Sequence, residues 1–141
     1  MSSRGAAVPA DPRPGATLVR GRDVAWDEMR PEAGTPQPPA ELVAQARREG
    51  ARRKRLLRGE GGFFVNRSSL PAGFRIPPHE HDHDELLVVL SGGCRLDGAL
   101  GELGPEDAIA IRAGTRYGFT AGPEGMEFLT IRTGEAATDL A

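Results

Sequence analysis

A chain of 141 residues is long enough for one ordinary domain with a hydrophobic core, and its net charge of −2 gives no general attraction to nucleic acid or anionic membranes. The single cysteine, Cys94, excludes an internal disulfide, and no apolar run reaches the length of a signal segment or a membrane span. We therefore expect a cytoplasmic protein of one domain that binds neither nucleic acid nor membranes.

Residues 1–40 are predicted to form an N-terminal arm ahead of a single domain at residues 41–133, and residues 134–141 a C-terminal tail. The arm is rich in proline and its first sixteen residues show no periodicity, so part of it should be flexible. Trp26 is the only tryptophan. We expect it to pack onto the outside of the domain rather than to stack on a ligand, because large aromatic side chains dominate packing energetics.

The segment after the arm combines a helix signal with a run of basic residues. Residues 40–49 have a helix-forming composition and lie between Pro39 and Gly50, so one short helix is predicted there. Residues 47–58 carry seven basic side chains, but they straddle the helix end and a strand and include no aromatic residue that could stack on a base. We interpret the run as a solvated face or a local acid–base network.

From residue 52 onward, short apolar stretches alternate with turn residues, and no helical periodicity separates them. Short strands at this spacing favour an antiparallel barrel or sandwich. The strands are expected at residues 52–58, 62–70, 74–81, 85–91, 94–97, 108–112, 115–120 and 126–132.

Three histidines and a glutamate stand close together in the segment GFRIPPHEHDHDELLVVLSG. His79 and His81 are two residues apart, so on an extended strand their side chains leave the same face. Glu85 has the same parity but would lie about 20 Å from His79 on a straight strand, so the chain must reverse at residues 82–84. Imidazole nitrogen and carboxylate oxygen together suit a first-row divalent metal ion. These three side chains are therefore the predicted metal ligands.

The spacing of Gly73, His79, His81, Glu85 and Gly92 reproduces every fixed position of the first motif of the cupin superfamily, which this chain resembles. The resemblance implies an all-β jelly-roll barrel in a small single-domain bacterial cupin, here with a Pro-rich N-terminal arm and one short helix. It also implies that His79, His81 and Glu85 point into the barrel and hold a divalent ion such as Fe, Mn, Ni or Zn.

The second motif of the family is matched with departures that affect the metal site. Gly114 is kept, but Arg112, Tyr117 and Ala121 stand where the family has Pro, His and often Asn. The usual fourth ligand is therefore missing. His83, at the tip of the predicted turn, is either its replacement or a solvent-exposed residue explained by its aspartate neighbours.

Tyr117 and Glu85 are the candidate catalytic residues. A phenol with an ordinary pKa of about 10 is a poor ligand for a divalent ion at neutral pH. We therefore expect Tyr117 to be a hydrogen-bonding wall residue or a proton donor to a bound substrate.

Three further side chains are candidates for substrate binding. Arg75 shares the parity of the histidines unless Pro77–Pro78 break the register, so it either clamps a substrate carboxylate or enolate or faces water at the barrel mouth. Phe119 and Phe128 are candidate apolar walls of the binding site, although core packing explains them equally well.

The stretch Leu86–Leu90 is apolar on both parities, so both of its faces must be covered. If Glu85 faces the interior, the outward side chains need either the N-terminal arm or a second subunit. Relatives in the cupin superfamily often pair through this face, so we expect a homodimer. The outward strip consists of Leu86, Val88 and Leu90.

Two functions from different classes follow from the resemblance. The first is a metal-dependent enzyme acting on a small organic molecule, of the dioxygenase, isomerase, lyase or cyclase type, because a three-ligand metal leaves open positions for a substrate. The second is a non-catalytic small-molecule binding or sensor module, which the missing second-motif histidine favours. Fold alone does not choose between them. We predict the enzyme and keep the module as the alternative.

Overall fold

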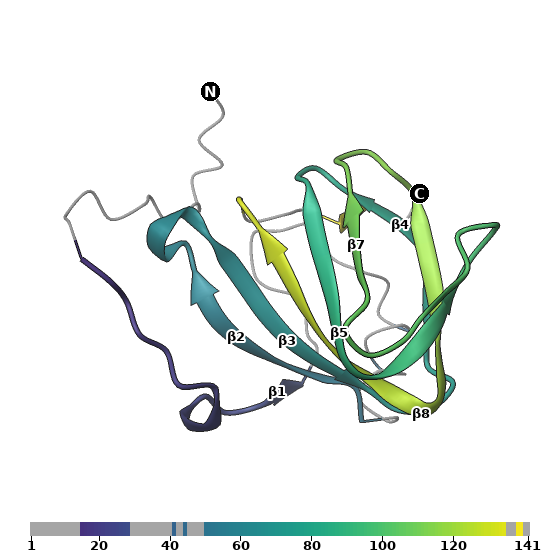
Figure 1. Cartoon of the computed structure of the whole chain (residues 1–141), viewed down its shortest axis with the longest axis horizontal. Helices are drawn as coiled ribbons and strands as arrows, with labels where there is room; N and C mark the ends of the chain where they lie inside the picture. The colour runs from purple at the N-terminus through teal and green to yellow at the C-terminus, as the bar shows by residue number, and fades with distance from the viewer. Residues whose placement is uncertain (1–14, 29–40, 42–43, 45–49, 135–137, 140–141) are drawn as a thin grey trace.

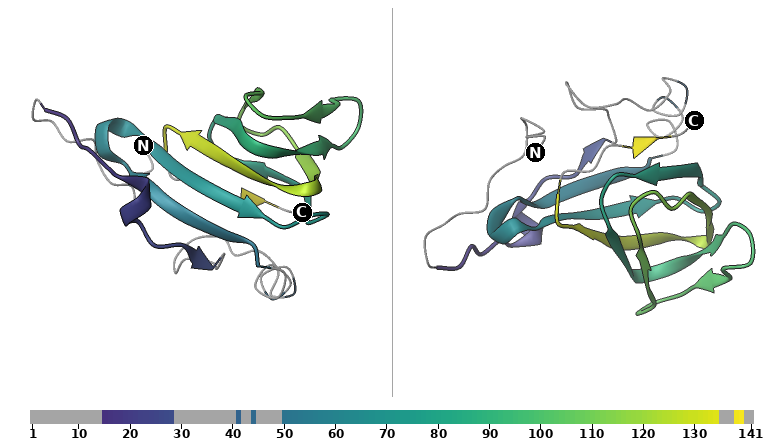
Figure 2. Two further views of the ribbon diagram at one scale, coloured as in Figure 1. Left: turned by 60° about the horizontal axis from the view of Figure 1, so that its bottom comes forward. Right: turned by 90° about the horizontal axis from the view of Figure 1, so that it is seen from above.

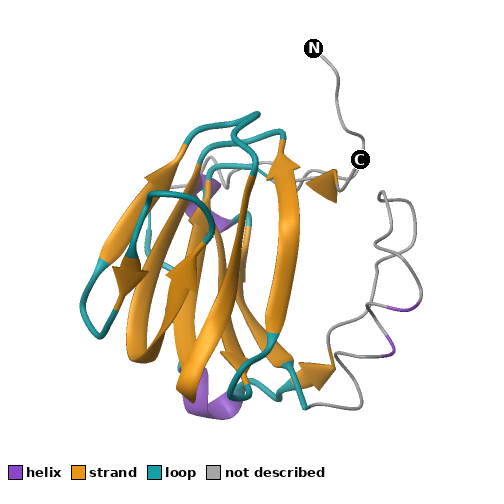
Figure 3. Cartoon of the chain, turned by 90° about the vertical axis from the view of Figure 1, so that its right-hand side faces the viewer, coloured by secondary structure: helices purple, strands orange, loops and turns teal. Residues whose placement is uncertain are grey.

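Almost all regular structure is β-strand in the part of the chain that this computed structural model describes, residues 15–28, 41, 44, 50–134 and 138–139 (Figure 3). Two short 3₁₀ turns, η1 (Gly21–Asp23) and η2 (Glu60–Gly62), interrupt it. The all-β prediction is confirmed. The strands are β1 (Asp27–Glu28), β2 (Arg52–Arg58), β3 (Phe64–Leu70), β4 (Arg75–His81), β5 (Glu85–Leu96), β6 (Glu102–Leu103), β7 (Ala108–Ile111), β8 (Tyr117–Arg132) and β9 (Thr138–Asp139).

Two long strands, β5 and β8, organise the fold because each of them contributes to both faces of the barrel (Figure 1). The first part of β5 pairs with β7 and with the last part of β8, which continues to β3. The last part of β5 pairs with β6 and with the first part of β8, which continues to β4. The result is an antiparallel jelly-roll barrel with one face in the order β7-β5-β8-β3-β2-β1 and the other in the order β6-β5-β8-β4-β9.

Glycines permit the bends that carry β5 and β8 from one face to the other. Gly92 in β5 has a φ of +69° and Gly125 in β8 a φ of +76°, both in the left-handed region that favours glycine. A Cβ atom on Gly92 would lie 2.1 Å from the carbonyl oxygen of Gly125. The two bends therefore touch, and a side chain at Gly92 would push them apart.

The alternation predicted for β5 is confirmed. Glu85, Leu87 and Val89 are buried, whereas Leu86 and Leu90 are each 38% exposed on the outer face and Val88 between them is half-buried. The inward side chains of the other strands complete an apolar core. Its largest fully buried members are Phe74, Leu87, Met126 and Val89.

Most predicted strands are present. The differences arise where a strand bends but continues its hydrogen bonding to the neighbouring strand. The predicted strands at 85–91 and 94–97 form the single strand β5, and those at 115–120 and 126–132 form the single strand β8. Strands β1, β6 and β9 are too short to carry a periodic pattern, so the sequence did not predict them. Of these, β9 lies in the predicted C-terminal tail and pairs with β4.

The described part of the N-terminal arm, residues 15–28, runs along the outer side of β2 (Figure 2). The guanidinium carbon of Arg52 lies 4.5 Å and Lys54 Nζ lies 4.8 Å from the centre of the Trp26 ring. Lys54 also donates a hydrogen bond of 2.8 Å to the carbonyl oxygen of Gly21. Trp26 therefore packs on the outside of the barrel as predicted, and two residues of the basic run hold it there.

The predicted helix at 40–49 lies largely outside the described residues. Of this segment the structure describes only Glu41 and Ala44, and both are helical. Residues 1–14 and 29–39 of the predicted arm also lie outside them. In the described part of the chain, no helix is long and apolar enough to cross a membrane.

Replacing Gly92 by alanine should destabilise the barrel much more than the same change at Gly98. Both glycines have a positive φ, but the space around Gly98 is open, whereas a Cβ at Gly92 meets the Gly125 carbonyl. Gly98→Ala should lower the free energy of unfolding by about 1–2 kcal/mol, the usual cost of a left-handed L-residue. Gly92→Ala should lower it by about 3 kcal/mol or more. Denaturant unfolding measures both, and equal losses would show that the two bends do not touch.

Candidate functional site

A bulge in β4 turns His79 toward the inside of the barrel. Strand β4 pairs Ile76 with Phe119 of β8 but pairs His79 with Tyr117, so β4 has one residue more than β8 between these positions. The extra residue falls at Pro77–Pro78, where β4 has no N–H groups to donate to the ladder. His79 therefore shares the inner face with Tyr117, which is itself buried.

His79 and His81 form a buried pair of imidazoles with ring centroids 4.8 Å apart and ring planes at 77°. Nδ1 of His79 lies 2.8 Å from the carbonyl oxygen of Pro77, so we assign the proton to Nδ1 and an available lone pair to Nε2. Burial lowers the pKa of His79, and the Pro77 hydrogen bond and the charge of Glu85 only partly offset this effect. His79 is therefore neutral at pH 7, the form that binds metal ions.

The carboxylate of Glu85, inside the barrel, contacts residues from both faces, Tyr117 and Arg132. The hydroxyl of Tyr117 donates to Oε1, and Nε of Arg132 donates to Oε2 at 2.8 Å. Nη2 of Arg132 forms an ion pair with the same oxygen at 2.5 Å. Glu85 is 3% exposed, and burial alone would raise its pKa. The attraction of Arg132 and His81, together with the hydrogen bonds, outweighs burial and lowers the pKa. Glu85 is therefore ionised at neutral pH.

Tyr117 lies between the histidines and an aromatic wall. Its ring centroid is 4.5 Å from that of His79, and it stacks on Phe119 at 6.3 Å. Phe119 in turn meets Phe128 edge-on at 6.0 Å. Burial, and then the charge of Glu85, raise the pKa of Tyr117 well above its ordinary value. The phenol therefore keeps its proton and acts as a hydrogen-bond donor.

Arg75 is not brought together with the histidines. Its guanidinium donates to both carboxylate oxygens of Asp97, at 2.7 and 2.6 Å, and to the hydroxyl of Thr120 at 3.2 Å. Because of the extra residue at Pro77–Pro78, Arg75 and His79 leave opposite faces of β4. Arg75 consequently lies on the outer face of the barrel, where its side chain is 42% exposed.

His83 lies at the turn between β4 and β5. Its Nδ1 is 2.9 Å from Oδ1 of Asp82. The ring packs against Gly134, where a Cβ atom would lie 2.2 Å from Nε2 of His83. These contacts account for the position of the ring, and a role of His83 as the replacement fourth ligand stays a prediction.

The cluster meets some of the requirements of a metal site. Nε2 of His81 is 3.9 Å from Oε2 of Glu85, a separation compatible with two ligands of one ion. Nevertheless, within the described residues no group of three or more His, Cys, Asp or Glu side chains is arranged to hold an ion. Both oxygens of Glu85 already accept hydrogen bonds. The imidazoles suit a divalent ion. The carboxylate can bind the ion only if it first releases a hydrogen bond from Tyr117 or Arg132.

Arg132 is the member of the cluster that the sequence analysis missed. A signal was available, because Phe128, Thr130 and Arg132 have the same parity on β8. Since Phe128 was expected to face inward, extension of the alternation by four residues would have placed Arg132 inside as well.

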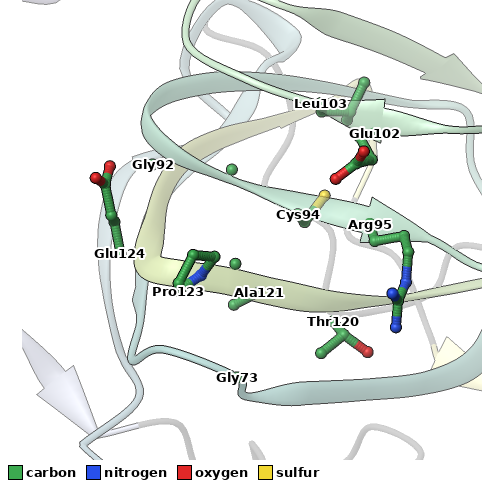
Figure 4. Close-up of a pocket in the computed structure, with 12 residues that line it drawn as sticks. Gly73, Gly92, Cys94, Arg95, Glu102, Leu103, Thr120, Ala121, Pro123 and Glu124 are labelled. Atoms are coloured by element: carbon green, nitrogen blue, oxygen red, sulfur yellow. The ribbon is translucent and has the colours of Figure 1, made fainter.

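A pocket of about 430 Å³ lies where β5 and β8 bend, and none of the predicted site residues lines it (Figure 4). Figure 4 shows its side chains on three neighbouring strands, β6, β5 and β8, with Gly73 beyond β8. Cys94 lines it from β5, and burial raises the pKa of this thiol to about 11. The thiol is therefore protonated at neutral pH, which makes it a poor nucleophile.

Comparison with known proteins gives a family match that runs from within β3 to the end of β8. Residues 66–132 match the family described as Cupin domain, and a search of curated proteins found no match. Among solved structures, the chain is similar to the polyketide cyclase RemF from Streptomyces resistomycificus, with 24% identity, a TM-score of 0.66, and coverage of 90% of this chain and 86% of that one.

Two further solved structures share the fold. One is a sugar phosphate isomerase of the cupin superfamily from Silicibacter pomeroyi, with 22% identity, a TM-score of 0.67, and coverage of 89% of this chain and 82% of that one. The other is a chain in the Rhodobacter sphaeroides complex of SigE with the anti-sigma ChrR, with 21% identity, a TM-score of 0.54, and coverage of 84% of this chain and 51% of that one.

Proposed function

Because the chain belongs to the cupin superfamily, we propose that it is a metal-dependent enzyme that acts on a small organic molecule inside its barrel. One observation carries the proposal: ionisable side chains from both faces converge in an otherwise apolar interior. Buried ionisable groups cost stability unless they are paired, so their concentration in one place is typical of a site that performs chemistry. The converging residues are His79, His81, Glu85, Tyr117 and Arg132.

His79 and His81 would hold a divalent ion, such as Fe, Mn, Ni or Zn, with Glu85 as the third ligand once it releases a donor. When bound, the ion would supply Lewis-acid polarisation of a substrate oxygen. Phe119 and Phe128 would form apolar walls that position the carbon skeleton of the substrate. Arg75 has no role in this proposal, because it is paired with Asp97 on the outer face.

Tyr117 and Glu85 are proposed to act as one unit. Since Tyr117 keeps its proton, it would donate a hydrogen bond to a substrate oxygen that takes the place of the carboxylate. Glu85 would orient the phenol before the substrate arrives, through the hydrogen bond that it accepts at Oε1. Isomerase and cyclase chemistry are the classes that we favour, and the likeness to a polyketide cyclase and a sugar phosphate isomerase supports them.

A non-catalytic binding or sensor module is the second candidate. The observation that favours it is that Glu85 is already satisfied by Tyr117 and Arg132, which leaves a paired rather than a reactive carboxylate. The likeness to a chain in a complex with the anti-sigma ChrR also supports it. In this case the barrel would bind a small molecule without converting it.

Removal of His79 or His81 should abolish metal binding, whereas removal of His83 should not. Wild type, His79→Ala, His81→Ala and the matched control His83→Ala are stripped of metal, reloaded with Fe(II), Mn, Ni or Zn, and analysed for metal content. We expect about one ion per chain in wild type and His83→Ala and less than a tenth of that in the other two variants. Metal loss in His83→Ala would instead make His83 the fourth ligand.

The loaded proteins are then offered phenolic and 1,3-dicarbonyl compounds, with oxygen uptake and proton exchange in D₂O as readouts. Turnover by wild type that disappears in His79→Ala supports the enzyme. Saturable binding of a compound with no turnover by any loaded form would support the module and contradict the enzyme.

Replacement of Tyr117 by phenylalanine should keep the metal and slow the reaction. The change preserves the ring between His79 and Phe119 and removes only the hydroxyl that donates to Glu85. We expect kcat to fall by about 100-fold, the usual worth of a positioned proton donor. Thr130→Val removes another buried hydroxyl from the inside of β8 and should leave kcat within about threefold. An equal loss in both variants would reduce Tyr117 to a packing residue.

A homodimer through the outer face of β5 is also proposed, because Leu86 and Leu90 are each 38% exposed there. Leu86→Glu should convert a dimer into a monomer in light scattering coupled to size exclusion. Leu100→Glu introduces the same charge at a side chain that is 60% exposed and lies in the loop after β5. It should leave the assembly unchanged. A dimer that survives Leu86→Glu would exclude this face.

A further inference from the structure

We propose that Arg132 sets the metal affinity of the barrel by competing with the ion for Glu85. The inference rests on the metal site proposed above and concerns a residue that is not itself a ligand. It predicts that the barrel binds a divalent ion more weakly than its two histidines and carboxylate would allow, and that a neutral residue at position 132 strengthens binding.

The first argument is the number of lone pairs on the carboxylate. An ionised carboxylate has about four acceptor positions, two on each oxygen. Nε of Arg132 donates to Oε2, Nη2 of Arg132 forms an ion pair with the same oxygen, and the hydroxyl of Tyr117 donates to Oε1. Oε2 is also the oxygen that approaches Nε2 of His81, at 3.9 Å. The oxygen best placed to share an ion with His81 is therefore the one that Arg132 fills.

The second argument is the permanence of the pair. Glu85 and Arg132 are direct partners in the β5–β8 ladder, so the backbone register itself holds the guanidinium against the carboxylate. The side chains are 1% and 18% exposed, so water has little access to the contact. An arginine is also always charged. A divalent ion must therefore displace a buried cation, or bind beside it against electrostatic repulsion.

The test compares Arg132→Met with Arg67→Met. Both changes remove one positive charge that is paired with a glutamate, but Arg67 pairs with Glu127 on the outer face, where the side chains are 40% and 32% exposed. Metal-free proteins are titrated with NiCl₂ in a calorimeter and with CoCl₂ in the visible spectrum, which reports the ligand set. Arg132→Met should lower the Kd about 10- to 100-fold, the size of effect that changing a partner of a ligand usually has. Here the change is a gain, because this partner competes with the ion. Arg67→Met should change it by less than about twofold.

A double variant identifies the carboxylate as the source of the gain. Glu85→Gln combined with Arg132→Met should return the Kd to the wild-type value or above, because an amide replaces the ionised third ligand. If Arg132→Met proves insoluble, Arg132→Lys replaces it: lysine keeps the charge but loses the planar fork. A smaller gain of about threefold to tenfold is then expected, and an unchanged Kd overturns the proposal.

The outcomes separate this inference from the proposed function. Equal affinities in wild type and Arg132→Met overturn the role of Arg132 and leave the metal-dependent function standing. Binding by Arg132→Met alone supports the role of Arg132 and contradicts a metal-dependent wild type. No binding by either protein overturns both.

Discussion

The rest of the structure depends on how the barrel accommodates one buried charge, the carboxylate of Glu85. A carboxylate at 3% exposure is destabilising unless it is paired and hydrogen-bonded. Tyr117 and Arg132 provide both, and they come from the two ends of the same strand, β8, while Glu85 is the first residue of β5. Residues at three element ends thus meet at one carboxylate. For both contacts to form, β8 must bend so that its first residue, Tyr117, and its last residue, Arg132, lie close to the same carboxylate.

The bends at Gly92 and Gly125 make that return possible. Because they pass close to each other without side chains, each long strand serves one face of the barrel and then the other. The histidines reach the same level by a different device, the Pro77–Pro78 bulge of β4. The polar cluster is therefore held by strand geometry rather than by loops, and strand geometry positions side chains more precisely than loops do.

The sequence predicted the inner face wherever a simple alternation holds. The parity of Glu85, Leu87 and Val89 gave their burial correctly, and the reversal before Glu85 follows from its distance to His79. Prediction failed where the count of residues changes along a strand. A bulge separates the face of Arg75 from that of His79. The bent strand β8 was predicted as two strands, which hid the link between Tyr117 and Arg132. Neither the partner of a buried charge nor the register of a distant strand is encoded in local periodicity.

The pairing of Glu85 also bears on the chemistry that we propose for this barrel. In a site of two histidines and one free carboxylate, the carboxylate offsets part of the charge of a divalent ion. Here Arg132 already neutralises that carboxylate, so the cluster offers a cation little negative charge. If a bound molecule takes the place of the carboxylate, as we propose, the Tyr117 hydroxyl and the Arg132 guanidinium would stabilise negative charge on it, because both donors are fixed before the reaction begins. This is why the proposed function favours reactions in which a substrate oxygen becomes more negative, as in the isomerisation or cyclisation of carbonyl compounds, over reactions in which the substrate gains positive charge.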